Sequence, residues 1–99
     1  MAVLEQNFAV GWEFPTEVEI DAPAADMAAW LSRTIGRIEP VDASHCRLLG
    51  STSDPAWYAE VLAAIPAPFR VVGGPELRTA VRVLGERLIA AAGPDLANP

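Results

Sequence analysis

The end of the chain is the feature that most constrains its fold. The stretch Phe69-Arg70-Val71-Val72-Gly73-Gly74-Pro75-Glu76-Leu77-Arg78 leads into an amphipathic run that continues to Ala92. A short apolar segment followed by two glycines predicts a strand and a tight turn, because glycine adopts positive φ at little cost. Proline suits the first helical position, where its missing N–H would have no partner, and an acid there suits the helix dipole. The sequence therefore predicts a domain that closes with a strand, a turn and a helix.

Length and charge limit what the chain can do. It has 99 residues, of which 52% are hydrophobic and 20% charged, and this predicts a single globular domain with one small core. Seven arginines are outnumbered by thirteen acids, so the net charge is −6. Nucleic-acid binding depends on clustered cations that neutralise phosphates, and this balance argues against it. The lone Cys46 excludes an intrachain disulfide and a zinc site of several cysteines, and it fits a reducing, cytoplasmic compartment.

Hydrophobic periodicity predicts four strands and three helices. Thr16–Asp21 alternates strictly between apolar and acidic residues, which is typical of a half-buried strand. Further strands are expected at 37–41, 45–51 and 69–72, and helices at 23–35, 54–65 and 75–92. Residues 1–14 are interpreted as a linker or the tail of a preceding domain, residues 15–94 as the domain, and residues 95–99 as a disordered tail.

This order of elements predicts an α+β domain, a ferredoxin-like βαββαβ sandwich with an additional C-terminal helix. Right-handed crossovers predict that the first and third strands form a central, parallel pair. Two helices would cover one face of the sheet and leave the other face open or covered by a partner. The expected core consists of apolar residues at strand and helix spacing: Val18, Ile20, Trp30, Leu31, Leu48, Trp57, Val61, Leu62, Phe69, Val71, Leu77, Val81 and Leu84.

Charged side chains mark the open face of this predicted sheet. Glu17, Glu19 and Asp21 share one face of the first strand, and neighbouring strands should bring His45, Arg47 and Arg70 to the same face. Paired carboxylates can perform acid–base chemistry. Opposite charges on adjacent strands also form a structural ladder, with each pair contributing roughly 0.2–1 kcal/mol. Two further interpretations stay open: pairing of this face with a second copy about a two-fold axis, and binding of an anionic effector by arginine forks.

Four other features have a structural and a functional interpretation. His45 and Cys46 are neighbours on a strand, so Cys46 should be buried and His45 exposed, and a catalytic pair should not form. The turn Gly73-Gly74 lacks the lysine and glycine spacing of phosphate-binding loops, which favours a simple tight turn. Trp30, Trp57 and Tyr58 are expected in the core, with Tyr58 at its rim, rather than in an aromatic ligand cage. Arg78 and Arg82, one turn apart, indicate a solvated face or an acidic partner.

Several stretches together resemble a known family over residues 16–92. They are Val18-Glu19-Ile20-Asp21-Ala22-Pro23-Ala24, Gly36-Arg37-Ile38-Glu39-Pro40-Val41-Asp42, Cys46-Arg47-Leu48-Leu49, Trp57-Tyr58-Ala59-Glu60-Val61-Leu62 and Phe69-Arg70-Val71-Val72-Gly73-Gly74-Pro75-Glu76-Leu77. In order and spacing they resemble the C-terminal extension of WYL-domain bacterial transcriptional regulators. The resemblance implies a ferredoxin-like fold and places the DNA-reading helix and the WYL ligand site outside this chain.

The expected function follows from the resemblance and from the missing catalytic pattern. We expect a non-catalytic module for dimerisation and effector response in a WYL-type regulator, with no cofactor, no metal, no membrane association and no direct contact with nucleic acid. The alternative is a free-standing module that binds a small molecule on the open sheet face. In either case the candidate residues for the ligand or dimer face are Glu17, Glu19, His45, Arg47 and Arg70.

Overall fold

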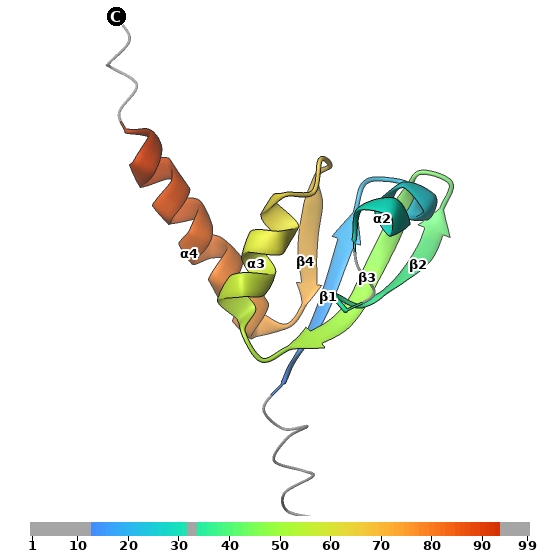
Figure 1. Ribbon diagram of the computed structural model, residues 1–99, viewed down its shortest axis with the longest axis horizontal. Helices are drawn as coiled ribbons and strands as arrows, with labels where there is room; N and C mark the ends of the chain where they lie inside the picture. The colour runs from blue at the N-terminus through green and yellow to red at the C-terminus, as the bar shows by residue number, and fades with distance from the viewer. Residues whose placement is uncertain (1–12, 32–33, 94–99) are drawn as a thin grey trace, which may run out of the picture.

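The computed structural model describes residues 13–31 and 34–93 and shows an α+β domain. Its elements follow in the order β1 (Phe14–Ile20), α2 (Ala24–Trp30), β2 (Arg37–Asp42), β3 (His45–Thr52), α3 (Pro55–Ala63), β4 (Phe69–Gly73) and α4 (Pro75–Ala92) (Figure 1). Each expected strand and helix is therefore present. Most of the predicted linker at 1–14 and the whole predicted tail at 95–99 lie outside the described residues, whereas Phe14 already belongs to β1.

The four strands form one antiparallel sheet in the order β2-β3-β1-β4. β1 and β3 are the central pair, as expected, but they run antiparallel, so the predicted parallel pairing is wrong. The reason is the short hairpin after β2. α2 carries the chain back so that β2 runs in the direction of β1, and the hairpin then reverses the chain into β3. The register places Val18 opposite Leu48 and Glu19 opposite Arg47.

One face of the sheet holds the hydrophobic core. Alternate side chains of β1 and β3 are fully buried there: Val18, Ile20, Cys46 and Leu48. Each of the three helices contributes to the same cluster, with Met27 from α2, Tyr58, Ala59 and Leu62 from α3, and Leu77 from α4. The helices therefore lie against one face of the sheet, which leaves the other face without a helical layer (Figure 1).

Two tryptophans predicted to be in the core lie at the surface. Trp30 is 55% exposed and Trp57 is 48% exposed, whereas Tyr58, expected at the rim, is only 1% exposed. The Tyr58 hydroxyl donates a hydrogen bond to the Ile35 carbonyl over 2.6 Å and accepts one from Thr16 Oγ1 over 3.1 Å. Tyrosine suits this buried position better than tryptophan, because its hydroxyl has these two hydrogen-bond partners inside the core.

The first helix is shorter than its periodicity predicts. α2 ends at Trp30 because Leu31 adopts an extended backbone with φ −104° and ψ 136°. Ile35, expected on the helix, is still 4% exposed and enters the core from the connection to β2. The remaining predicted core residues are buried or pack against the core, so the two tryptophans are the exceptions.

The turn before the last helix requires glycine. Gly74 has φ +101°, and a Cβ atom built on it would lie 2.4 Å from the Pro15 carbonyl oxygen. This geometry agrees with the predicted tight turn. α4 then packs beside α3 over its first half, and its second half projects away from the sheet (Figure 1). Leu88 and Ile89 on that second half are 53% and 74% exposed.

Candidate functional site

The sheet face opposite the helices carries all five candidate residues. Strand alternation directs Glu17 and Glu19 of β1 to this face, and the register places Arg47 of β3 and Arg70 of β4 on either side of Glu19. His45 lies at the start of β3. We call this surface the open face and define it by Glu17, Glu19, Asp21, His45, Arg47 and Arg70.

Glu19 is the centre of an ion-pair network. Its Oε1 accepts a hydrogen bond from Arg70 Nη2 over 2.5 Å, and its Oε2 lies 3.4 Å from Arg47 Nη2. These two guanidinium groups, with the Arg70 hydrogen bond contributing most, lower the pKa of Glu19. Because Glu19 remains ionised, it is suited to holding two arginines in place and unsuited to accepting a proton near neutral pH.

Arg47 bridges two carboxylates of β1. Its Nη1 lies 3.4 Å from Glu17 Oε2, in addition to the contact between its Nη2 and Glu19. The Nε atom of Arg47 is buried without a hydrogen-bond partner in the part of the chain that the structure describes. Arg47 thus has one unsatisfied donor, which the surrounding side chains cover from solvent.

His45 and Asp21 form the other end of the network. His45 Nδ1 lies 2.8 Å from Asp42 Oδ1, and His45 Nε2 lies 3.7 Å from Asp21 Oδ1. The hydrogen bond with Asp42 is the main reason that the pKa of His45 is raised. Asp21 Oδ1 is also 3.7 Å from Arg70 Nη2, and it has no hydrogen-bond partner among the described residues.

Asp42, the last residue of β2, belongs to this network although it was not among the candidate residues. Its Oδ1 accepts a hydrogen bond from the Ser44 backbone N–H over 2.8 Å, and this bond is the main cause of its lowered pKa. The sequence signal was an aspartate followed two residues later by serine and three residues later by histidine. That pattern is typical of an Asx turn, and the same Oδ1 atom also lies 2.8 Å from His45 Nδ1.

The expected separation of His45 and Cys46 is confirmed. Cys46 is fully buried in the core, whereas the His45 side chain is 40% exposed on the open face. Burial raises the pKa of the Cys46 thiol, which disfavours the thiolate that acts as a nucleophile. Within residues 13–31 and 34–93, no group of three or more histidine, cysteine, aspartate or glutamate side chains could hold a metal ion.

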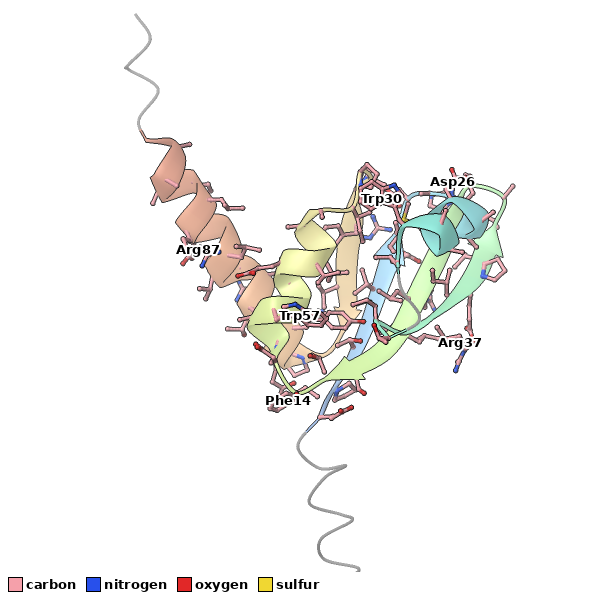
Figure 2. The ribbon with its side chains drawn as sticks, viewed as in Figure 1. Phe14, Asp26, Trp30, Arg37, Trp57 and Arg87 are labelled. Atoms are coloured by element: carbon pink, nitrogen blue, oxygen red, sulfur yellow. The ribbon has the colours of Figure 1, made fainter. Side chains whose placement is uncertain are left out.

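The three aromatic side chains weighed as a ligand cage do not come together. Trp30 and Trp57 belong to different helices and lie far apart, as Figure 2 shows. Trp57 contacts Tyr58 edge to face, with ring centroids 6.4 Å apart, but the Tyr58 hydroxyl is occupied inside the core. The aromatic residues of α2 and α3 therefore do not enclose a shared site.

The open face thus consists of alternating, ion-paired charges at partial exposure. It can exchange its internal ion pairs for contacts with a complementary charged surface without burying an unpaired charge. Comparisons of the chain with protein-family models, curated proteins and solved structures found no match. Among the described helices, none combines the length and apolar character needed to cross a membrane.

Proposed function

We propose that this chain is a non-catalytic module for dimerisation and effector response in a WYL-type transcriptional regulator. In this proposal the module acts in the cytoplasm, and a domain outside the chain binds DNA. The observation that carries the proposal is the sheet itself, which is covered by helices on one face and presents a charged network on the other. The sequence resemblance to the extension of these regulators is the second support.

The fold that we propose is the ferredoxin-like βαββαβ sandwich with α4 as an additional helix. Read from β4, the strands follow the order 4-1-3-2, with α2 between β1 and β2 and α3 between β3 and β4. Two split βαβ units arranged in this way support the assignment. In such a domain the face without helices is the natural surface for a second copy.

The open face has the composition of a self-complementary interface. About a two-fold axis, a patch must contact the same patch of a second copy, so it needs acids and bases in nearly equal number. Glu17, Glu19 and Asp21 lie among Arg47, Arg70 and His45, and Leu49 adds a half-buried apolar side chain on the same side of β3.

Sedimentation equilibrium of the chain tests the dimer. We expect twice the chain mass for the wild type and the monomer mass for Leu49→Glu, because a carboxylate at Leu49 would enter the interface without a partner. Ile89→Glu is the matched control, since Ile89 is an exposed apolar residue on α4. Leu49→Ser replaces Leu49→Glu if that variant does not fold. A monomeric wild type, or dissociation only by Ile89→Glu, would contradict the assignment to the open face.

The link to regulators has a separate test. We expect the DNA upstream of the Met1 codon in the source genome to continue in frame through a WYL domain and a winged helix. A stop codon and a ribosome-binding site directly before Met1 would overturn this part of the proposal. The free-standing ligand-binding module would then take its place, with the guanidinium groups of Arg47 and Arg70 on the open face as its candidate anion contacts.

A further inference from the structure

A depression of about 480 Å³ lies where β4, the last strand of the sheet order, meets the first turns of α4. Its lining consists of three arginines and two valines: Arg70, Val71, Arg78, Val81 and Arg82. This arginine depression gathers three of the seven basic residues of a chain whose net charge is −6. No carboxylate belongs to the lining that the described residues form.

The three arginines differ in how well their charges are compensated. Arg70 contacts Glu19 and Asp21 on the open face. Arg78 Nη2 donates to the Val71 carbonyl over 3.0 Å, so its partner is a neutral oxygen. Arg82 has no hydrogen bond or ion pair with any described residue. Neither Arg78 nor Arg82 therefore forms an ion pair with a carboxylate of the described residues.

The rest of α4 shows that this imbalance is local. Arg87, labelled on α4 in Figure 2, lies 3.5 Å from Glu60 of α3. The arginine that faces α3 thus has a carboxylate partner, whereas the two arginines beside β4 do not. Guanidinium groups four residues apart on a helix repel each other, and an anion between them would replace that repulsion with two attractions.

The shape of the site indicates what kind of anion fits. The Arg78 hydrogen bond occupies a carbonyl of the edge strand, which hinders the addition of an extended peptide to β4. Val71 and Val81 supply an apolar wall beside the charges. We propose that the arginine depression binds a compact oxyanion, with phosphate or carboxylate oxygens held between the guanidinium forks of Arg78 and Arg82 and with Arg70 at the rim.

Titration of the isotope-labelled chain followed by amide chemical shifts tests this site. Pyrophosphate and citrate are added in separate series at constant ionic strength. We expect saturable shifts at residues 69–72 and 77–82 in at least one series, and the series that responds identifies the phosphate or carboxylate class. Absence of saturable shifts in both series, or shifts spread evenly over the surface, would overturn the proposal.

Matched arginine variants show whether binding is local. Arg82→Gln and Arg78→Gln should each raise the Kd roughly tenfold or more, because each removes a charge-assisted hydrogen bond. Arg87→Gln makes the same charge change on the other side of α4 and should alter the Kd less than about twofold. An equal loss in Arg87→Gln would indicate diffuse attraction and contradict the site.

This inference shares Arg70 with the open face of the proposed dimer, but it is tested on Arg78 and Arg82. Arg82 makes no contact that the fold needs, so Arg82→Gln remains decisive even if Arg78→Gln destabilises the edge of β4. Neither residue belongs to the open face. The sedimentation experiment and the anion titration can therefore fail separately, and each result bears on its own proposal.

Discussion

At the scale of single residues, the structure separates neighbours that look alike in the sequence. Trp57 and Tyr58 are adjacent aromatic residues, but the sheet receives only Tyr58 because its hydroxyl reaches the Ile35 carbonyl. Periodicity finds the apolar stripe of a helix, but it leaves the rotation of that helix uncertain by about one residue, or roughly 100°. Which aromatic residue is buried therefore depends on tertiary partners that lie 23 and 42 residues away in the sequence.

Removal of one hydroxyl tests this account of the core. Tyr58→Phe should lower the free energy of unfolding by about 1–3 kcal/mol, because the Ile35 carbonyl and the Thr16 hydroxyl would lose their buried partner. Urea denaturation measures the change. Trp57→Phe, made at an exposed neighbour, is the control and should change stability by less than about 0.5 kcal/mol. Equal effects of the two substitutions would show that the Tyr58 hydrogen bonds contribute nothing specific.

The residue His45 gives the molecule a pH dependence with a definite sign. Contact with Asp42, and more weakly with Asp21 and Glu19, raises the pKa of folded His45 above its ordinary value of about 6.5. Its contribution to stability is therefore complete below about pH 6.5 and is lost as pH rises through the raised pKa. The pKa of Asp42 is lowered from about 3.8, so Asp42 contributes to stability above that pH, and this contribution is lost as pH falls through the lowered pKa.

Comparison with a neutral variant isolates the histidine effect. The urea midpoint of the wild type should exceed that of His45→Gln at pH 5.5–6.5, and the difference should shrink steadily toward pH 9. A difference that stays constant over this range would mean that protonated His45 has no special stabilisation in the fold.

At the scale of elements, strong local patterns were predictive and weak ones were not. The alternation over Thr16–Asp21 predicted β1 and both of its faces, and hence the charges that meet on the open face. The helix predicted at 54–65 is present as α3, and Asp54 at its start accepts a hydrogen bond from the Trp57 backbone N–H. The end of α2 was not predictable, because Leu31 leaves the helix while the apolar spacing continues to Ile35.

Two glycines of the last strand–helix unit provide opposite tests of element geometry. Gly74→Ala should destabilise the domain by more than about 1 kcal/mol, because φ is +101° and the new Cβ would collide with the Pro15 carbonyl. Gly85→Ala should stabilise it by about 0.5–1 kcal/mol, since a Cβ at this helical position meets nothing within 4 Å. Thermal and urea unfolding measure both changes, and the same sign in both variants would contradict the geometry.

At the scale of the whole molecule, the fold class was predictable and the direction of its central strands was not. The pattern of strands and helices indicated an α+β domain, but strand direction depends on how connections return the chain to the sheet. The hairpin at 43–44 reverses β3 relative to β2, and β3 therefore opposes β1. The alternation of β1 predicted the charged open face. The contact of Asp42 with this network was visible only in the structure, because it depends on the turn that Asp42 forms with Ser44.

The molecule should also tolerate loss of the outer end of its last helix. A chain that ends after Arg87 should have a free energy of unfolding within about 1 kcal/mol of that of the full chain, because every side chain from Leu88 to Ala92 is exposed. A chain that ends before Leu77 should not fold, because it lacks a fully buried core residue. Circular dichroism with urea titration distinguishes the two, and a large loss in the longer chain would show that the helix tip stabilises the domain.

The strict alternation of β1 also disfavours pairing with β3 in the wrong register. If β1 paired with β3 one residue out of step, Glu17 and Glu19 would turn inward against Leu62 and Leu77, while Val18 and Ile20 would turn outward to water. Such a misregistered sheet would enclose carboxylates far from Arg47 and Arg70, at a cost that hydrophobic contacts would not recover. The same charges that form the open face therefore make any arrangement slipped by an odd number of residues a poor competitor of the native sheet.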